Sequence, residues 1–404
     1  MNETFFGIPP EGTFFHDRDF LAQCLTVIEN HIGDHAWLVH HIELVHKVLC
    51  SALEVDPLVH RAINNFIRII PDFMLSDNYN APLDRAFQAL LHAMDLKDPN
   101  LVAQVASTMA SFNPLKGNIP SAYANVKTAL SYAKEATDVD AILRAYVRVI
   151  EALSFRNFKN MPPDLVAETL HLVNFTEDPR VMNEVHLVMA HMFNYQQDAK
   201  SALHHGHIAF SLADQLRDNT YKMRALLMLG VTHRLMGNFA AAEDYVQCAL
   251  ELRDGVTSER RIGYMLCELA GLRYDQKNFA ESERLYLEAR RMFTDLRLPY
   301  NIVLADHGLG LVWLQTGRYD EARTTLLGVL DEYRWNDNTH GVANINYALG
   351  RCEARAGNPQ AALTFLRTAN GLLAQLEPSP SRDEVFHWTR HWIDKVQSGE
   401  FGTV

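Results

Sequence analysis

Residues 226–249 read LLMLGVTHRLMGNFAAAEDYVQCA, and residues 306–329 read DHGLGLVWLQTGRYDEARTTLLGV. Each stretch holds a leucine followed by a glycine, a turn glycine eight residues past that leucine, then an aromatic residue and an alanine. The pair of a large apolar and a small residue occurs five times, 40 positions apart, at Met189-Ala190, Leu229-Gly230, Leu269-Ala270, Leu309-Gly310 and Leu349-Gly350. A fixed period of roughly 20 to 50 residues is typical of a solenoid of stacked repeats.

Each unit predicts two helices. From Tyr221 to Leu235 the apolar residues recur at steps of three and four, which is the spacing of one helix face. Gly237 then turns the chain at little steric cost, and a second helix is expected from Phe239. The small residue of each pair lets the second helix cross close to the first. Because one hairpin cannot bury its own apolar face, stability must come from stacking several.

This order of residues resembles the tetratricopeptide repeat, and the resemblance extends from Val181 to Leu376. It implies an all-α fold, a right-handed superhelical solenoid of antiparallel helix pairs. The unit departs from the family in its length of 40 residues, where the basic unit has about 34. It also lacks the tryptophan early in the first helix, which is replaced by Leu226, Leu266, Asp306 and Asn346. Units of this length are similar to the sensor solenoids of large bacterial transcription activators and of signalling adaptors.

The whole chain divides on this basis into four parts. These are a lead-in at residues 1–16, degenerate helical repeats or a helical cap at 17–180, five repeats at 181–377, and a capping helix and tail at 378–404. In the second part, breakers such as Pro71-Asp72 separate eight expected helices: 17–32, 36–53, 57–70, 82–94, 101–111, 121–135, 139–154 and 163–173. The last helix is expected to begin with a capping box at Ser381 to Glu384, and its apolar stripe is Val385, Trp388, Trp392 and Val396.

Composition favours a cytoplasmic globular protein. The chain is 48% hydrophobic and 21% charged, and it has neither an apolar run long enough to span a membrane nor the pattern of a signal peptide. The net charge of −12 and the absence of a long basic block argue against direct nucleic-acid binding. Five scattered cysteines predict reduced core residues.

No catalytic signature is found, so the sequence predicts neither an enzyme nor a cofactor. The one cluster that invites a metal is N-terminal, with His31, His35, His40, His41 and His46, and with Glu43 three residues before His46. Carboxylate-bridged metal bundles need two Glu-x-x-His pairs and two further glutamates, and only one pair is present. No metal ligand is therefore assigned, and a metal-dependent enzyme remains a third hypothesis.

The resemblance implies that the first helix of each unit lines a concave groove. Transferred residue by residue, the groove positions hold Glu184, His191, Asn194, Tyr195, Arg224, Arg234, Tyr264, Tyr274, Asp275, His307, Gln315, Asn344, Tyr347, Arg351 and Arg355. Tyrosine and arginine often anchor interfaces, and arginine suits carboxylates. The lysine and asparagine with which one sub-class grips an acidic peptide C-terminus are absent, so that chaperone-tail function is not expected.

The leading hypothesis is a non-catalytic adaptor that holds a protein or peptide segment in the groove, with Arg351 and Arg355 favouring acidic groups. The alternative is a regulatory sensor whose solenoid binds a small molecule or a signalling peptide. The helix that carries Trp388 and Trp392 could equally form a homodimer contact. The sequence leaves the identity of the partner open.

Overall fold

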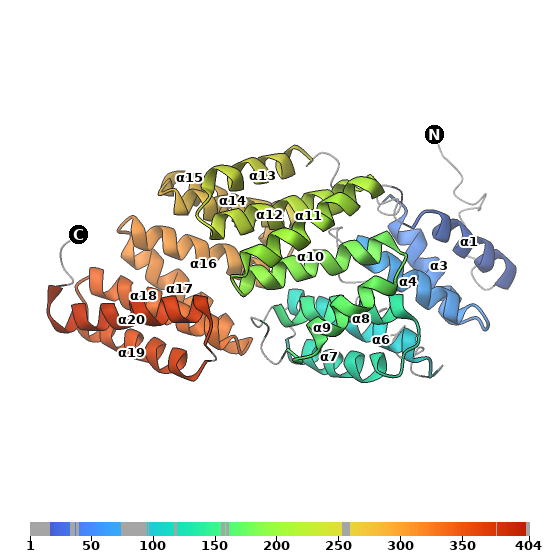
Figure 1. Cartoon of the computed structure of the whole chain (residues 1–404), viewed down its shortest axis with the longest axis horizontal. Coiled ribbons are helices and arrows are strands. Elements are labelled where there is room, and N and C mark those ends of the chain that lie inside the picture. Colours follow the sequence, from blue (N-terminus) through green and yellow to red (C-terminus); the bar gives the residue numbers. More distant parts are fainter. Residues whose placement is uncertain are drawn as a thin grey trace. The chain divides into compact units, whose positions relative to one another are not determined.

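The computed structural model describes residues 17–32, 37, 40–73, 95, 97–116, 119–154, 158, 161–252, 259–376 and 378–400. The regular structure of these residues is helical (Figure 1). The chain divides into two compact units. Unit 1 comprises residues 1–112, 120–149 and 257–259, and unit 2 comprises residues 113–119, 150–256 and 260–404. Among the helices described, none is long and apolar enough to cross a membrane.

Unit 1 contains α1 (Arg18–Asn30), α3 (Ile42–Leu53), α4 (Val59–Phe73), α6 (Pro99–Phe112) and most of α7 (Ile119–Ala133) and α8 (Val139–Ser154). Arg61 of α4 joins α4 to α1, because its Nε and Nη2 donate to the two carboxylate oxygens of Glu29 at 2.7 and 2.6 Å. The breaker expected at Pro71 was wrong, since α4 runs through it and ends two residues later. The expected lead-in and the helix at 82–94 lie outside the described residues.

Unit 2 contains five helix pairs with the predicted 40-residue period. The first helices begin at residues 179, 219, 259, 299 and 339, and each has 17 residues: α10 (Pro179–Tyr195), α12 (Asn219–Leu235), α14 (Glu259–Asp275), α16 (Pro299–Gln315) and α18 (Thr339–Arg355). The second helices are α11 (Ala199–Leu216), α13 (Phe239–Glu251), α15 (Phe279–Asp295), α17 (Tyr319–Trp335) and α19 (Pro359–Gln375). Unit 2 also holds α9 (Leu165–Leu172), α20 (Pro380–Gln397) and two short 3₁₀ turns, η2 (Asn113–Lys116) and η3 (Val173–Phe175). The all-α solenoid of helix pairs is thus confirmed.

The turn inside each pair repeats as closely as the helices do. One residue per turn has a positive φ, at Gln197 (57°), Gly237 (73°), Lys277 (62°), Gly317 (79°) and Gly357 (84°). Only glycine adopts this left-handed conformation without steric cost, which explains why three of the five positions hold it. The next residue but one begins the second helix in every case.

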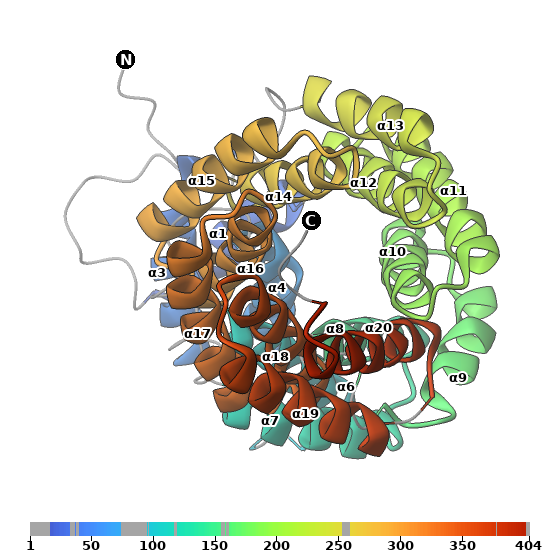
Figure 2. The same cartoon turned by 90° about the vertical axis from the view of Figure 1, so that its left-hand side faces the viewer.

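The small residues of the repeated pairs lie where the two helices of a unit cross. A Cβ added to Gly350 in α18 would be 2.5 Å from Cγ of Leu366 in α19, and one added to Gly310 in α16 would be 2.5 Å from Cδ2 of Leu326 in α17. Either contact is closer than carbon atoms approach one another, so glycine permits the observed crossing. The first helices form the inner layer of the array and the second helices the outer layer (Figure 2).

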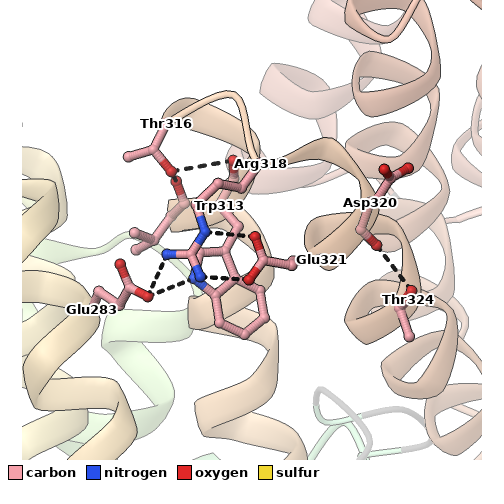
Figure 3. Close-up of polar contacts among 8 residues, drawn as sticks. Glu283, Trp313, Thr316, Arg318, Asp320, Glu321 and Thr324 are labelled. Carbon is pink, nitrogen blue, oxygen red and sulfur yellow. Dashed lines mark hydrogen bonds and ion pairs between the residues drawn. The ribbon is translucent and has the colours of Figure 1, made fainter.

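Neighbouring helix pairs of unit 2 are joined by a polar contact that also repeats. A residue of one second helix meets a residue 30 positions later in the next first helix, as in Glu243–Arg273, Glu283–Trp313 and Arg323–Glu353. The charges are reversed in the third pair. In the second pair, Trp313 Nε1 donates to Glu283 at 2.8 Å, while Arg318 donates to Glu283 and Glu321 and covers the indole ring (Figure 3).

Helix α20 takes the place of a sixth first helix, since it begins near residue 379 of the same register and packs Ile393 against the core that contains Ala362 and Leu366. Arg390 stands where the repeats have Gly310 or Gly350, so a further second helix could not cross α20 closely there.

Two details of this helix differ from expectation. Its N-cap is Ser379, whose Oγ accepts from the Arg382 N–H at 3.2 Å, and not Ser381, because Pro380 already occupies the first helical position. Trp388 is 45% exposed, while Thr389 is fully buried, so Trp388 does not belong to the packed stripe.

Candidate functional site: the inner face of unit 2

The residues predicted for a groove fall on the five first helices of unit 2, and we call the surface that they follow the inner face. Helix α10 carries Glu184, His191, Asn194 and Tyr195; α12 carries Arg224 and Arg234; α14 carries Tyr264, Tyr274 and Asp275; α16 carries His307 and Gln315; and α18 carries Asn344, Tyr347, Arg351 and Arg355. In α18 the spacing of three or four residues places all four side chains along one stripe of the helix.

Two of these residues join the first two helix pairs of unit 2 to one another. Glu184 is 9% exposed and accepts a hydrogen bond from the Tyr221 hydroxyl at 2.9 Å. Asn194 is 5% exposed and donates from Nδ2 to the Met228 carbonyl at 3.3 Å. Both side chains connect α10 to α12, and they are therefore best placed to fix the spacing of the helices beneath the inner face.

His191 of α10 lies beside residues that precede the repeats. Its side chain is exposed to solvent, yet its pKa is lowered, first by desolvation and then by the balance of Glu151 and Arg224 nearby. Phe158 packs edge-on against His191 with ring centroids 5.7 Å apart, and Arg224 forms an ion pair with Glu151 at 3.3 Å.

The middle of the inner face is polar but internally neutralised. Arg234 of α12 lies 2.9 Å from Asp275 and 3.6 Å from Glu268, both on α14. Desolvation raises the pKa of Tyr264 to about 12 and lowers that of His307 to about 4. His307 is therefore neutral at pH 7, and its Nδ1 lies 3.1 Å from the Tyr333 hydroxyl.

A chain of side-chain contacts crosses three first helices toward the C-terminal end of the array. Gln315 of α16 donates from Nε2 to the Tyr274 hydroxyl of α14 at 3.0 Å, and Arg355 of α18 donates from Nη1 to Oε1 of Gln315 at 3.2 Å. These contacts link residues 40 or 41 positions apart, so the same place in successive repeats becomes one continuous strip.

Arg351 and Arg355 differ from the other inner-face arginines. Among the residues that the structure describes, no carboxylate lies within ion-pair distance of either one. Both guanidinium carbons lie 5.8 Å from the centre of the Trp392 ring of α20, and Lys395 Nζ lies 5.5 Å from it. The pKa of Arg355 is lowered, first by desolvation and second by the charge of Arg351. The arrangement concentrates positive charge at a partly buried position.

The first and the last helix pairs approach one another at one aromatic contact on the inner face. The Tyr195 ring at the end of α10 lies edge-on to the His340 ring at the start of α18, with centroids 6.4 Å apart. Asn344 Nδ2 lies 3.3 Å from Nδ1 of that histidine. A segment bound on this face would therefore touch helix pairs that are far apart in the sequence.

Two family models, both described as tetratricopeptide repeat, match residues 267–334 and 301–369. These matches lie within α14 to α19, the helices whose period and crossing have been described. The segment from residue 267 to residue 369 therefore consists of tetratricopeptide repeats.

Three solved structures share the fold of the chain. A Rap protein complexed with Competence and Sporulation Factor is 12% identical, with a TM-score of 0.54 over 84% of this chain and 99% of that one. A STAND signal transduction ATPase with a tetratricopeptide repeat sensor, from Pyrococcus horikoshii, is 14% identical, with a TM-score of 0.51 over 97% and 55%. Aspartyl phosphate phosphatase F from Bacillus subtilis is 12% identical, with a TM-score of 0.50 over 91% and 96%. No curated protein matches the chain in sequence.

Four residues that contact the predicted groove residues, directly or through Trp392, were missed by sequence reasoning. Glu151 and Phe158 precede the repeats and carry no periodic signal. Trp392 was assigned to the apolar stripe of the capping helix, and Lys395 was not among the predicted groove residues. Lys395 stands 40 positions after Arg355 and 80 after Gln315, so extending the repeat register through α20 would have placed it beside the strip.

The predicted metal hypothesis gains no site from the described part of the chain. No group of three or more His, Cys, Asp or Glu side chains there could hold a metal ion. Of the N-terminal histidines, His35 lies outside the described residues, and the side chains of Glu43 and His46 are not described. His31 and His41 each contact a backbone carbonyl one turn earlier, at 2.8 Å.

Proposed function

We propose that the protein is a non-catalytic scaffold that holds a peptide or protein segment on the inner face of unit 2. The observation that carries the proposal is the inner strip, which runs through Tyr274, Gln315 and Arg355 and joins three successive helices. An extended peptide has a polar group every residue, and a strip of alternating aromatic, amide and cationic side chains can hydrogen-bond it along its length.

The contact between Tyr195 and His340 supports the same function. It brings the first and the last helix pairs of the inner face within reach of one bound segment. Because the helices that line this face are held by buried hydrogen bonds such as that of Glu184, the surface is largely formed before binding, and less entropy is lost on association.

A regulatory sensor is the second candidate, and the Tyr195–His340 contact favours it. Since these rings join the two ends of the array, a ligand bound between them would change the pitch of the whole solenoid. The Rap protein bears on this proposal by analogy, because its structure was determined with Competence and Sporulation Factor. In a sensor of this kind, the bound segment is the signal, and its binding changes the shape of the helix array.

The test is a selection of random dodecapeptides displayed on phage, followed by fluorescence-polarisation titration of the best synthetic peptide. The inner-face variant is His191→Glu/Asn344→Glu, and the matched control is Arg291→Glu/Arg367→Glu on the outer helices α15 and α19, where both arginines are exposed. We expect the inner variant to bind at least about tenfold more weakly, which corresponds to about 1.4 kcal/mol.

Equal affinity of the inner variant and the wild type would contradict binding on the inner face, as would failure to select any peptide. The two candidate functions are separated by small-angle scattering with and without saturating peptide. A scaffold keeps its radius of gyration, while a sensor changes it, and Tyr195→Ala/His340→Ala would abolish that change.

A further inference from the structure

We infer that Arg351 and Arg355 form an acid-binding subsite of the inner face, which takes the side-chain carboxylate of a Glu or Asp in the bound segment. This inference rests on the proposed function and specifies the chemistry of the segment. It follows from the charge balance, the geometry and the hydrogen bonding of these two arginines.

The charge balance singles out this pair. The chain has 49 acidic and 37 basic residues, so an arginine has many potential partners. Arg224 is paired with Glu151, Arg234 with Asp275, and Arg323 with Glu353. For Arg351 and Arg355, no carboxylate of the described residues lies within 4.0 Å, although the two guanidinium groups are one helical turn apart and repel each other. An external carboxylate would balance both charges.

The geometry holds the two guanidinium groups in place without neutralising them. Each lies over the Trp392 ring at 5.8 Å, and Arg351 also lies 5.4 Å from the Tyr347 ring centre. Cation–π contacts of this kind fix an arginine while leaving its N–H groups directed elsewhere. Gln315 anchors Arg355 from the neighbouring helix by accepting from its Nη1.

Unused hydrogen-bonding capacity points to the ligand. Arg351 hydrogen-bonds the Tyr347 side chain, and its Nε has no acceptor among the described residues. Of the five N–H donors of Arg355, only Nη1 donates in the described structure, to Gln315 at 3.2 Å and to the Leu314 carbonyl at 3.5 Å. A carboxylate accepts several such bonds at once. Hydrogen bonds between arginine and a carboxylate carry charge on both partners, and they are stronger than hydrogen bonds between neutral groups.

A side-chain carboxylate fits better than a chain terminus, because the inner face continues on both sides of the pair. Asn344 lies further along α18, and Tyr274 lies across α16 on α14. A segment that covers these residues runs past the arginines, and therefore meets them with a side chain.

The test uses an array of random decapeptides, all amidated at the C-terminus so that no terminal carboxylate is present. Wild-type protein is compared with Arg351→Gln/Arg355→Gln, with Arg351→Lys/Arg355→Lys, and with the outer control Arg291→Gln/Arg367→Gln. Circular dichroism and the melting temperature establish that each variant is folded. For the strongest binders, synthetic peptides with each Glu or Asp changed to Gln or Asn are then titrated.

We expect wild-type binders to be enriched in Glu or Asp, and one acidic position to account for about a 10- to 100-fold change in affinity, as a charge-assisted hydrogen bond to a partly buried group provides. The Gln variant should lose this preference, the Lys variant should keep part of it, and the outer control should keep all of it. Raising NaCl from about 0.05 M to about 0.5 M should weaken binding of the acidic peptide only.

Peptide binding by the wild type with no acidic preference would overturn the subsite and leave the scaffold function standing. An acidic preference that persists in the Gln variant would also overturn it, since the carboxylate would then bind elsewhere. Binding by a second array of the same peptides with free C-termini, and none by the amidated array, would overturn the side-chain assignment in favour of a terminal carboxylate. No peptide binding at all would refute the scaffold function and the subsite together.

Discussion

The close crossing of the two helices in each unit can be tested by adding one methyl group at two places. In Gly350→Ala, the new Cβ would be 2.5 Å from Leu366 Cγ and 3.3 Å from the Ala362 carbonyl oxygen. In Gly371→Ala on α19, no atom lies within 4 Å of the new Cβ. Both glycines are inside helices, so both substitutions gain the same helix propensity, about 1 kcal/mol.

The difference between the two variants therefore isolates the steric cost. Leu366 is fully buried and cannot move away, and overpacking of this kind costs about 1–3 kcal/mol. We expect Gly371→Ala to be more stable than the wild type by about 0.5–1 kcal/mol, and Gly350→Ala to be less stable than Gly371→Ala by about 1–3 kcal/mol.

Urea unfolding followed by tryptophan fluorescence is the assay, because four of the five tryptophans, Trp313, Trp335, Trp388 and Trp392, lie in or next to the last two units. Adding Leu366→Ala to each variant should remove most of the difference in stability between Gly350→Ala and Gly371→Ala, because the new methyl group at position 350 clashes with the Leu366 side chain. Equal stability of the two single variants would refute the close crossing.

Three further predictions concern stability. Lys277→Gly should stabilise the protein by about 0.5–1 kcal/mol in thermal unfolding, because Lys277 has a φ of 62° where Gly237 stands one unit earlier. Glu353→Gln should destabilise it by about 3 kcal/mol in the same assay, since Glu353 is 4% exposed and bound by Arg323. The Arg323 hydrogen bonds lower the pKa of Glu353 despite its burial, so this contribution is present above about pH 4.5 and is lost as the pH falls further, which a pH series of wild type and variant would detect. Desolvation lowers the pKa of His186 and His205 to about 4, so the unfolded chain takes up protons first and stability should fall from about pH 6.5 toward pH 4, a slope that His186→Gln/His205→Gln should flatten.

The repeat was predictable because its determinants are local. A glycine at 237, 317 or 357 is required by the backbone of its own turn, and a small residue at 310 or 350 is required by the nearest neighbouring helix. Such requirements recur with the unit, and they remain visible when most side chains have changed.

The partners of the inner-face residues were not predictable in the same way. The sequence predicted both Arg234 and Arg351 as groove residues. Only the fold shows that Asp275 neutralises Arg234, while no carboxylate of the described residues forms an ion pair with Arg351. The face that α20 buries was misjudged for a similar reason, since Thr389 and not Trp388 meets the helices beneath it. In the first 180 residues the repeat motif has decayed, and the division of the chain proposed there remains a prediction.

Photo-crosslinking tests the central claim, the binding of a segment on the inner face, most directly. A selected peptide that carries benzoylphenylalanine at successive positions would be crosslinked to the full-length protein, and the attachment sites would be mapped by mass spectrometry. The account predicts attachment to α10, α12, α14, α16 and α18, with the acidic residue of the peptide beside Arg351 and Arg355. Attachment confined to α11, α13, α15, α17 and α19, or to unit 1, would contradict it.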